Sequence, residues 1–210
     1  MTLEINKSTI VKVIILVVVL IFAIIGYQIY QSYSKKATKK ELVSNLSNAG
    51  YLSAIILSDY SETMNAAQRY YGGNILNENG EYESSSDPQW ALEQRIKYYQ
   101  NIGIRSHLDS LKDVMQKQMK KIDSHDEEDL AFVSAFENVS KLLNYATAPS
   151  GSPMTLALEV GMYYSNFNSC MDKLGVYYKV SPRDSVIKWN SDFITKRGES
   201  FLQKRRKKKN

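Results

Sequence analysis

The chain has 210 residues, a net charge of +5 and a hydrophobic share of 43%. This length allows one domain with its own core, and the four prolines and ten glycines favour long helices over a sandwich of short strands. The single cysteine, Cys170, excludes an internal disulfide framework and a zinc site built from cysteines.

Residues 13–34 form a run of 22 residues without a charge, and the first 13 of them are all apolar. As a helix rising about 1.5 Å per residue, the run reaches about 33 Å and can cross a hydrocarbon core of about 30 Å. We therefore predict one transmembrane anchor at 13–34, preceded by a flank at 1–12. The residues after the apolar part match the aromatic and basic pattern of a membrane interface: Tyr27, Tyr30, Tyr33, Lys35, Lys36, Lys39 and Lys40.

A cleaved signal peptide and a buried core helix are the alternatives to a retained anchor. Signal peptides end in small residues at their cleavage site, whereas this run ends in the letters IIGYQIYQSYS. Two patterns bear on the direction of the anchor. The lysines after the run favour a cytoplasmic C-terminal side, whereas a short basic segment before an N-terminal anchor commonly stays inside. We expect the C-terminal domain outside the cytoplasm.

Charge is segregated along the chain. Residues 41–203 hold 15 basic and 21 acidic residues, a net charge of −6, and a cluster of basic residues lies on either side of this section. An acidic domain argues against a nucleic-acid-binding protein, whose basic residues should spread over a folded face. The basic ends instead fit anionic lipid, where each cation contributes about 1 kcal/mol. The candidate lipid contacts at the C-terminal end are Lys204, Arg205, Arg206, Lys207, Lys208 and Lys209.

The remaining pattern predicts an all-α fold, in which the anchor continues into an antiparallel four-helix bundle over residues 35–175. We expect helices at about 39–71, 88–122, 125–147 and 153–174, with a loop or small hairpin around Asn79-Gly80 at 72–87. Apolar residues of the first helix recur at spacings of three and four and predict its buried seam: Leu42, Leu46, Ala49, Ser53, Ile56, Tyr60, Thr63, Ala67 and Tyr70.

Local signals set the expected helix ends. Asp87-Pro88 and Ser152-Pro153 are N-cap and proline pairs that begin the second and fourth helices, and Ser124 can cap the third. Gly103 lies where the second helix could kink. Gly175 is expected to end the fourth helix at its C′ position.

A C-terminal amphipathic helix at 176–203 is expected to precede a polybasic tail at 204–210. Because successive helices of the bundle alternate in direction, this C-terminal helix is expected to begin near the bilayer. Three interpretations stay open: a solvated and frayed tail, a helix on the membrane surface, and a docking helix for a partner.

The sequence carries no catalytic motif, and we expect no enzymatic activity, no cofactor and no metal. His107 and His125 lack partners at metal-ligand spacing, and the acidic residues 126–129 are favourable charges at a helix N-terminus. Cys170 belongs to the apolar stripe of the fourth helix, where a thiol is a small buried hydrophobe. The stripe consists of Leu156, Val160, Tyr163, Phe167, Cys170 and Leu174.

Tyrosine is the one unusual side chain, because eight of the 15 tyrosines form adjacent pairs. Either one member of each pair packs in the core, or the pairs build a patch or pocket that Trp90 and Trp189 could join. Hydroxyls converging on an enclosed cavity would favour a ligand site, and an exposed patch would favour a protein contact. The paired residues are Tyr70, Tyr71, Tyr98, Tyr99, Tyr163, Tyr164, Tyr177 and Tyr178.

These observations predict a single-pass membrane protein whose bundle acts as an interaction scaffold or accessory subunit of a membrane or envelope complex. The expected partners are the membrane and another protein, or a second copy of the chain. The alternative is a ligand-binding, sensor-like bundle with a tyrosine-lined pocket. The architecture is similar to membrane-anchored four-helix sensor domains, which usually have a second membrane helix, whereas this sequence has no second apolar span.

Overall fold

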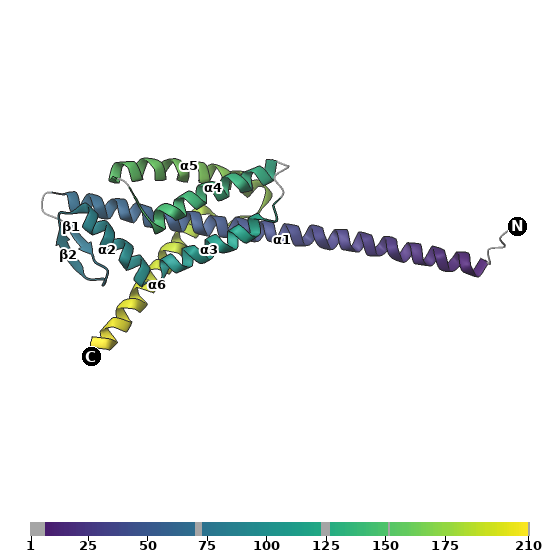
Figure 1. The fold of residues 1–210 in the computed structure, drawn as a ribbon, viewed down its shortest axis with the longest axis horizontal. Coiled ribbons are helices and arrows are strands. Elements are labelled where there is room, and N and C mark those ends of the chain that lie inside the picture. Colours follow the sequence, from purple (N-terminus) through teal and green to yellow (C-terminus); the bar gives the residue numbers. More distant parts are fainter. Residues whose placement is uncertain (1–6, 70–72, 123–126, 151, 210) are drawn as a thin grey trace. The chain divides into compact units, whose positions relative to one another are not determined.

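The computed structural model describes residues 7–69, 73–122, 127–150 and 152–209, and the side chains of 7–19, 153 and 209 lie outside this description. The predicted all-α bundle is confirmed, because the described chain is mostly helical (Figure 1). Its elements are α1 (Lys7–Gln68), β1 (Gly73–Leu76), β2 (Tyr82–Ser85), α2 (Pro88–Asn101), α3 (Ile104–Met119), α4 (Glu127–Thr147), α5 (Pro153–Tyr177) and α6 (Arg183–Lys209).

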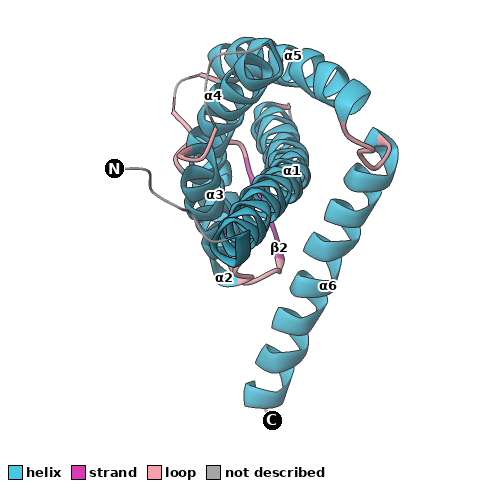
Figure 2. Ribbon diagram, turned by 90° about the vertical axis from the view of Figure 1, so that its right-hand side faces the viewer, coloured by secondary structure: helices cyan, strands magenta, loops and turns pink. Residues whose placement is uncertain are grey.

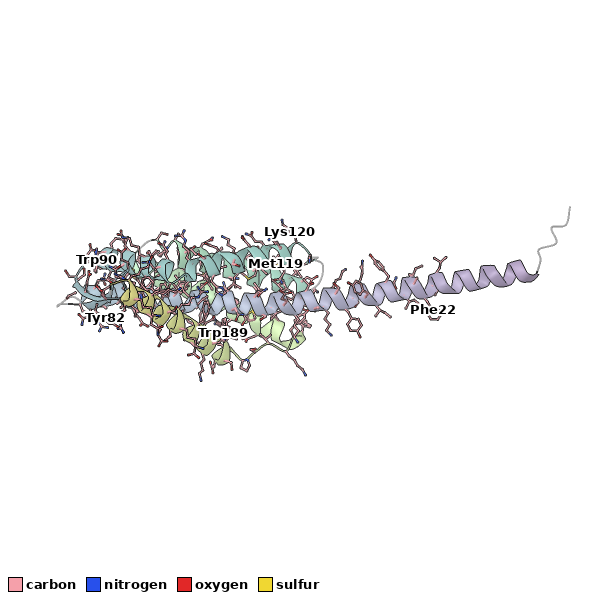
Figure 3. All side chains as sticks on the ribbon, turned by 90° about the horizontal axis from the view of Figure 1, so that it is seen from below. Phe22, Tyr82, Trp90, Met119, Lys120 and Trp189 are labelled. Atoms are coloured by element: carbon pink, nitrogen blue, oxygen red, sulfur yellow. The ribbon has the colours of Figure 1, made fainter. Side chains whose placement is uncertain are left out.

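The chain divides into two compact units, Met1–Lys40 and Glu41–Asn210, and α1 contributes to both. In the first unit, large apolar side chains of α1 are exposed, among them Phe22 at 70% (Figure 3). Among the residues that the structure describes, no helix has a stretch long and apolar enough to cross a membrane. The predicted anchor lies only partly within the description, since the side chains of 13–19 fall outside it.

In the second unit, α1 is the central helix. Buried residues lie on most of its faces between Leu42 and Ala67, which is typical of a helix surrounded by others. Figure 2 shows α3, α4 and α5 in an arc around α1, with α6 on another side. The predicted seam of α1 is buried except at Thr63, and the neighbouring Met64 is buried in its place. Tyr70 lies outside the described residues.

Side-chain contacts establish that neighbouring helices run antiparallel. Asn45 of α1 donates to Gln118 of α3 over 3.0 Å, whereas Asp59 of α1 pairs with Arg95 of α2. Residue numbers therefore increase along α1 in the direction in which they decrease along α2 and α3, so both of these helices run antiparallel to α1. In the same way, Tyr145 of α4 stacks on Tyr163 of α5, and Tyr178, just after α5, donates to Glu128 near the start of α4.

Residues 73–85 form a hairpin, which decides between the two alternatives for this segment. The strands are antiparallel, with Gly73 opposite Ser85 and Leu76 opposite Tyr82. In the loop, the side-chain oxygen of Asn77 accepts hydrogen bonds from the amides of Asn79 and Glu81. Gly80 has φ +75°, a left-handed conformation that glycine adopts without strain.

The segment 88–122, expected as one helix with a possible kink at Gly103, forms two helices, α2 and α3, that are separated at this position. Gly103 between them has φ +77°, a conformation in which a right-handed helix cannot continue. Asp87 caps α2 as expected, since its carboxylate accepts from the amides of Gln89 and Trp90. Ser124 lies outside the described residues.

Two expectations for the C-terminal third are wrong. Gly175 does not end α5, which continues to Tyr177 and stops where Tyr178 becomes extended. The basic residues 204–208 are not a separate tail, because they are part of α6. Helix α6 lies on its own bundle: Asn190 donates to the carbonyl of Asn48, and Arg205 donates to the carbonyl of Asn79 in the hairpin.

Candidate functional site

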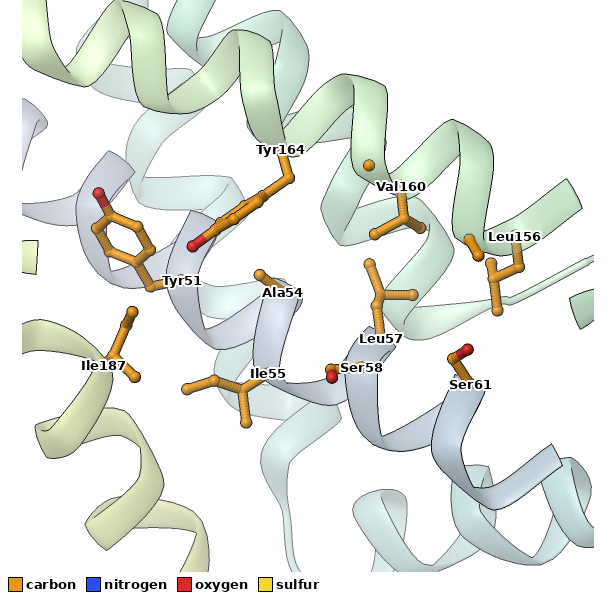
Figure 4. A pocket seen from close by; sticks show the side chains of 12 residues that line it. Tyr51, Ala54, Ile55, Leu57, Ser58, Ser61, Leu156, Val160, Tyr164 and Ile187 are labelled. Atoms are coloured by element: carbon orange, nitrogen blue, oxygen red, sulfur yellow. The ribbon is translucent and has the colours of Figure 1, made fainter. Parts of the chain in front are cut away.

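An apolar groove of about 410 Å³ lies between α1, α5 and α6 (Figure 4). None of the described residues that line it carries a charge, and its polar groups are hydroxyls of serine and tyrosine. Leu156 and Val160, which belong to the predicted stripe of α5, contribute to its wall. The lining consists of Tyr51, Ala54, Ile55, Leu57, Ser58, Ser61, Leu156, Ala157, Val160, Gly161, Tyr164 and Ile187.

Small side chains keep this groove open. Ala54 and Ser58 are one helical turn apart on α1, and Ala157 and Gly161 are one turn apart on α5. A Cβ added at Gly161 would meet no heavy atom within 4 Å, so the space beside this glycine is empty. The close approach of the two helices occurs further along, where a Cβ on Gly50 would overlap the ring of Phe167.

Two tyrosines lie at one end of the groove, opposite the end formed by Leu156 and Ser61 (Figure 4). The rings of Tyr51 and Tyr164 meet edge to face with centroids 6.3 Å apart. Burial, followed by the neighbouring Tyr164, raises the pKa of Tyr51 to about 12, so its hydroxyl stays protonated at neutral pH. The guanidinium of Arg183 lies 5.5 Å from the ring centre of Tyr164 and places a cation at this end.

The outward face of α5 carries a second apolar feature, next to the groove. Met154, Leu158 and Met162 follow one another at a spacing of four and are 73%, 65% and 51% exposed. We call these three residues the α5 outer face. Large apolar side chains gathered on one face mark interaction sites more often than scattered ones do.

The described tyrosine pairs do not gather into one patch, because they lie in different environments. Tyr99 is buried and donates to Asp59 over 3.0 Å, and its neighbour Tyr98 packs against Phe201 of α6. Burial raises the pKa values of both hydroxyls. Tyr70 and Tyr71 lie outside the described residues.

The pairs on α5 also separate. Tyr164 lines the groove, whereas Tyr163 faces α4, where Lys141 lies over its ring at 4.7 Å. Tyr178 is buried and donates to Glu128, and Tyr177 is half exposed. Trp90 on α2 and Trp189 on α6 are likewise far apart (Figure 3). The packing interpretation therefore accounts for most of these side chains.

The candidate catalytic groups lie apart from the groove. The ring of His107 packs at a tilt against Phe193 with ring centres 4.8 Å apart, and burial, followed by the charge of Arg197, lowers the pKa of His107. Burial raises the pKa of the Cys170 thiol, which makes it less reactive. His125 falls outside the described residues, and among the residues described no cluster of His, Cys, Asp and Glu could hold a metal ion.

Sequence reasoning missed most of the groove. It had found Leu156, Val160 and Tyr164, but not Tyr51, Ala54, Ala157, Gly161 or Ile187. The available signal was the repeated small residues on α1 and α5 beside the apolar seams. Comparisons with known proteins found no matching family model, no similar curated protein and no similar solved structure.

Proposed function

We propose that this chain is a membrane-anchored helical bundle that binds another protein through the α5 outer face, as a scaffold or accessory subunit of a membrane or envelope complex. The observation that carries this proposal is the exposure of Met154, Leu158 and Met162 on a folded helix. A helix that packs against its bundle on one face normally carries polar side chains on the opposite face, which is in contact with solvent.

The size of the face indicates what kind of contact it can make. Full burial of one such side chain contributes about 1.5–3 kcal/mol, so the three together contribute about 5–9 kcal/mol before any cost. Association costs at least about 4 kcal/mol in lost freedom of motion. The three residues therefore suit the centre of an interface whose rim is supplied by neighbouring polar residues.

The test is site-specific photocrosslinking of the full chain in its native membrane. A photoreactive amino acid at Leu158 should give a discrete adduct of higher mass. The same amino acid at Lys173, which is exposed on the same helix, should give none. Adducts of equal yield at both positions, or none at Leu158, would contradict the proposal.

The anchor is part of the same proposal, with residues 13–34 in the bilayer. The uncharged run and the exposed side chains of Leu20, Phe22 and Ile29 support it. The chain should stay in the membrane pellet after washing with alkaline carbonate. Replacing Leu20 and Ile24 with arginine should release it, because charges at the centre of a helix cost about 2.5–3.5 kcal/mol each.

We further propose that the bundle lies outside the cytoplasm. A periplasmic or extracellular reporter fused after Asn210 should then be active, and activity of a cytoplasmic reporter alone would overturn this location. The exposed residues Lys204, Arg206, Lys207 and Lys208 of α6 remain proposed contacts for anionic lipid. Replacing all four with glutamine should weaken binding of the full chain to anionic liposomes, and unchanged binding would exclude them.

A further inference from the structure

We propose that the groove between α1, α5 and α6 binds one aliphatic chain of a single-chain amphiphile such as a free fatty acid. The site is distinct from the α5 outer face and goes beyond the proposed binding of a protein partner. It rests on the volume, the lining and the two different ends of the groove.

The volume of the groove matches that of a small ligand. One turn of an α-helix, about 10 Å across and about 5.4 Å high, occupies about 420 Å³. The whole groove measures about 410 Å³, which is the volume of a single helical turn. At about 30 Å³ for a group of the size of a water molecule, the same space holds about a dozen such groups.

The lining suits an uncharged chain along most of its length. Leu57 and Val160 supply apolar contacts in the middle, and no charged residue belongs to the described wall. Ligand sites of about 300–1,000 Å³ are lined in this way, with a few polar groups that fix orientation. A two-chain phospholipid would need about twice the space, which is why we infer a ligand with one chain.

The tyrosine end suits a small polar head group. The hydroxyl of Tyr164 points into the groove (Figure 4), and Arg183 lies against the ring of this tyrosine. The carboxylates of Asp172 and Asp184 also act on Tyr51 at this end. One cation and two anions give this end a net charge of −1, which favours an uncharged head group such as a protonated acid, so the aliphatic chain is the part that the groove selects.

Two glycines of α5 provide a matched pair of variants. A Cβ at Gly161 or at Gly175 would meet no atom within 4 Å, but only Gly161 lines the groove. Gly161→Leu should place its side chain in the groove, and Gly175→Leu places the same side chain in open space outside it. Both changes replace a glycine with a better helix former, so both variants should keep the fold.

The experiment uses the full chain in phosphatidylcholine liposomes with a trace of a diazirine fatty acid. After photolysis, peptide mass spectrometry locates the labelled residues. We expect labelling at 54–61 and 156–164, about tenfold weaker in Gly161→Leu and unchanged in Gly175→Leu. A diazirine phosphatidylcholine should label 20–33 but not the groove.

Three results would overturn the inference: no label in the groove of the wild type, equal labelling in Gly161→Leu, or equal labelling by the phosphatidylcholine probe. Thermal unfolding of both variants checks that a loss of label is not a loss of fold. Leu158→Lys should leave the groove label unchanged, so failure of the proposed protein contact and failure of the ligand site can be told apart.

Discussion

Arg95 of α2 holds Asp59 of α1 through two hydrogen bonds, and the one from Nη2 to Oδ1 measures 2.8 Å. Tyr99 donates a third bond to the same carboxylate over 3.0 Å. Burial lowers the pKa of Arg95, but the hydrogen bonds and charge of Asp59 outweigh it and raise the pKa overall. The bundle therefore joins its central helix to α2 by a charged contact.

Asp59→Asn should lower the free energy of unfolding by about 2 kcal/mol, because it leaves the partly buried guanidinium of Arg95 without its counter-charge. Chemical denaturation of the full chain measures the change. Glu62→Gln, an exposed change on the same helix, should stay within about 0.5 kcal/mol of the wild type. Equal effects of the two variants would mean that the ion pair does not stabilise the bundle.

Gly50→Ala should destabilise the bundle by about 1–3 kcal/mol, because the new methyl group would overlap the ring of Phe167. Gly175→Ala should instead stabilise it by about 0.5–1 kcal/mol, since its Cβ enters open space and alanine favours a helix. Melting curves of the two variants should therefore shift in opposite directions. Shifts of the same sign would contradict the packing of α1 on α5.

Acid should destabilise the bundle in part through His107. Its pKa is lowered in the folded chain by burial and then by Arg197, so the unfolded chain binds the proton more readily. The stability that neutral His107 contributes is complete above the unfolded pKa of about 6.5 and is lost as the pH falls below it. His107→Gln should therefore lose less stability than the wild type between about pH 7.5 and about pH 5. Equal losses would show that His107 does not titrate in this way.

The end of α6 should be protected from hydrogen exchange, because Phe201 packs on Tyr98 and Leu202 lies against Gly80 of the hairpin. Phe201→Ala should speed amide exchange over residues 198–206. Gln203→Ala, an exposed change beside it, should not. Rapid exchange of this segment in the wild type would show that the end of α6 frays in solution and would contradict its contacts with Tyr98 and Gly80.

The sequence was informative where the pattern is local. The spacing of Leu42, Leu46 and Ala49 already predicted the buried face of α1, since positions three and four apart share one side of a helix. Asp87 and Pro88 likewise predicted the start of α2. Such features depend on residues that are close along the chain.

The groove and the position of α6 depend on residues that are distant along the chain. Tyr51, Gly161 and Ile187 meet only after three helices have packed, and no spacing in the sequence predicts their distance. The tyrosine pairs mislead for a related reason, because neighbours on a helix point about 100° apart. Tyr163 consequently faces α4, whereas Tyr164 faces the groove.

The most direct test of the account is the size of the complex that the full chain forms after mild detergent extraction from its native membrane. Native gel electrophoresis should show the wild type and Lys173→Gln in a species larger than the chain alone. A double variant with Leu158→Gln and Met162→Gln should migrate as the chain alone, with an unchanged melting temperature. A complex of unchanged size in the double variant would contradict the assignment of the α5 outer face as the partner site.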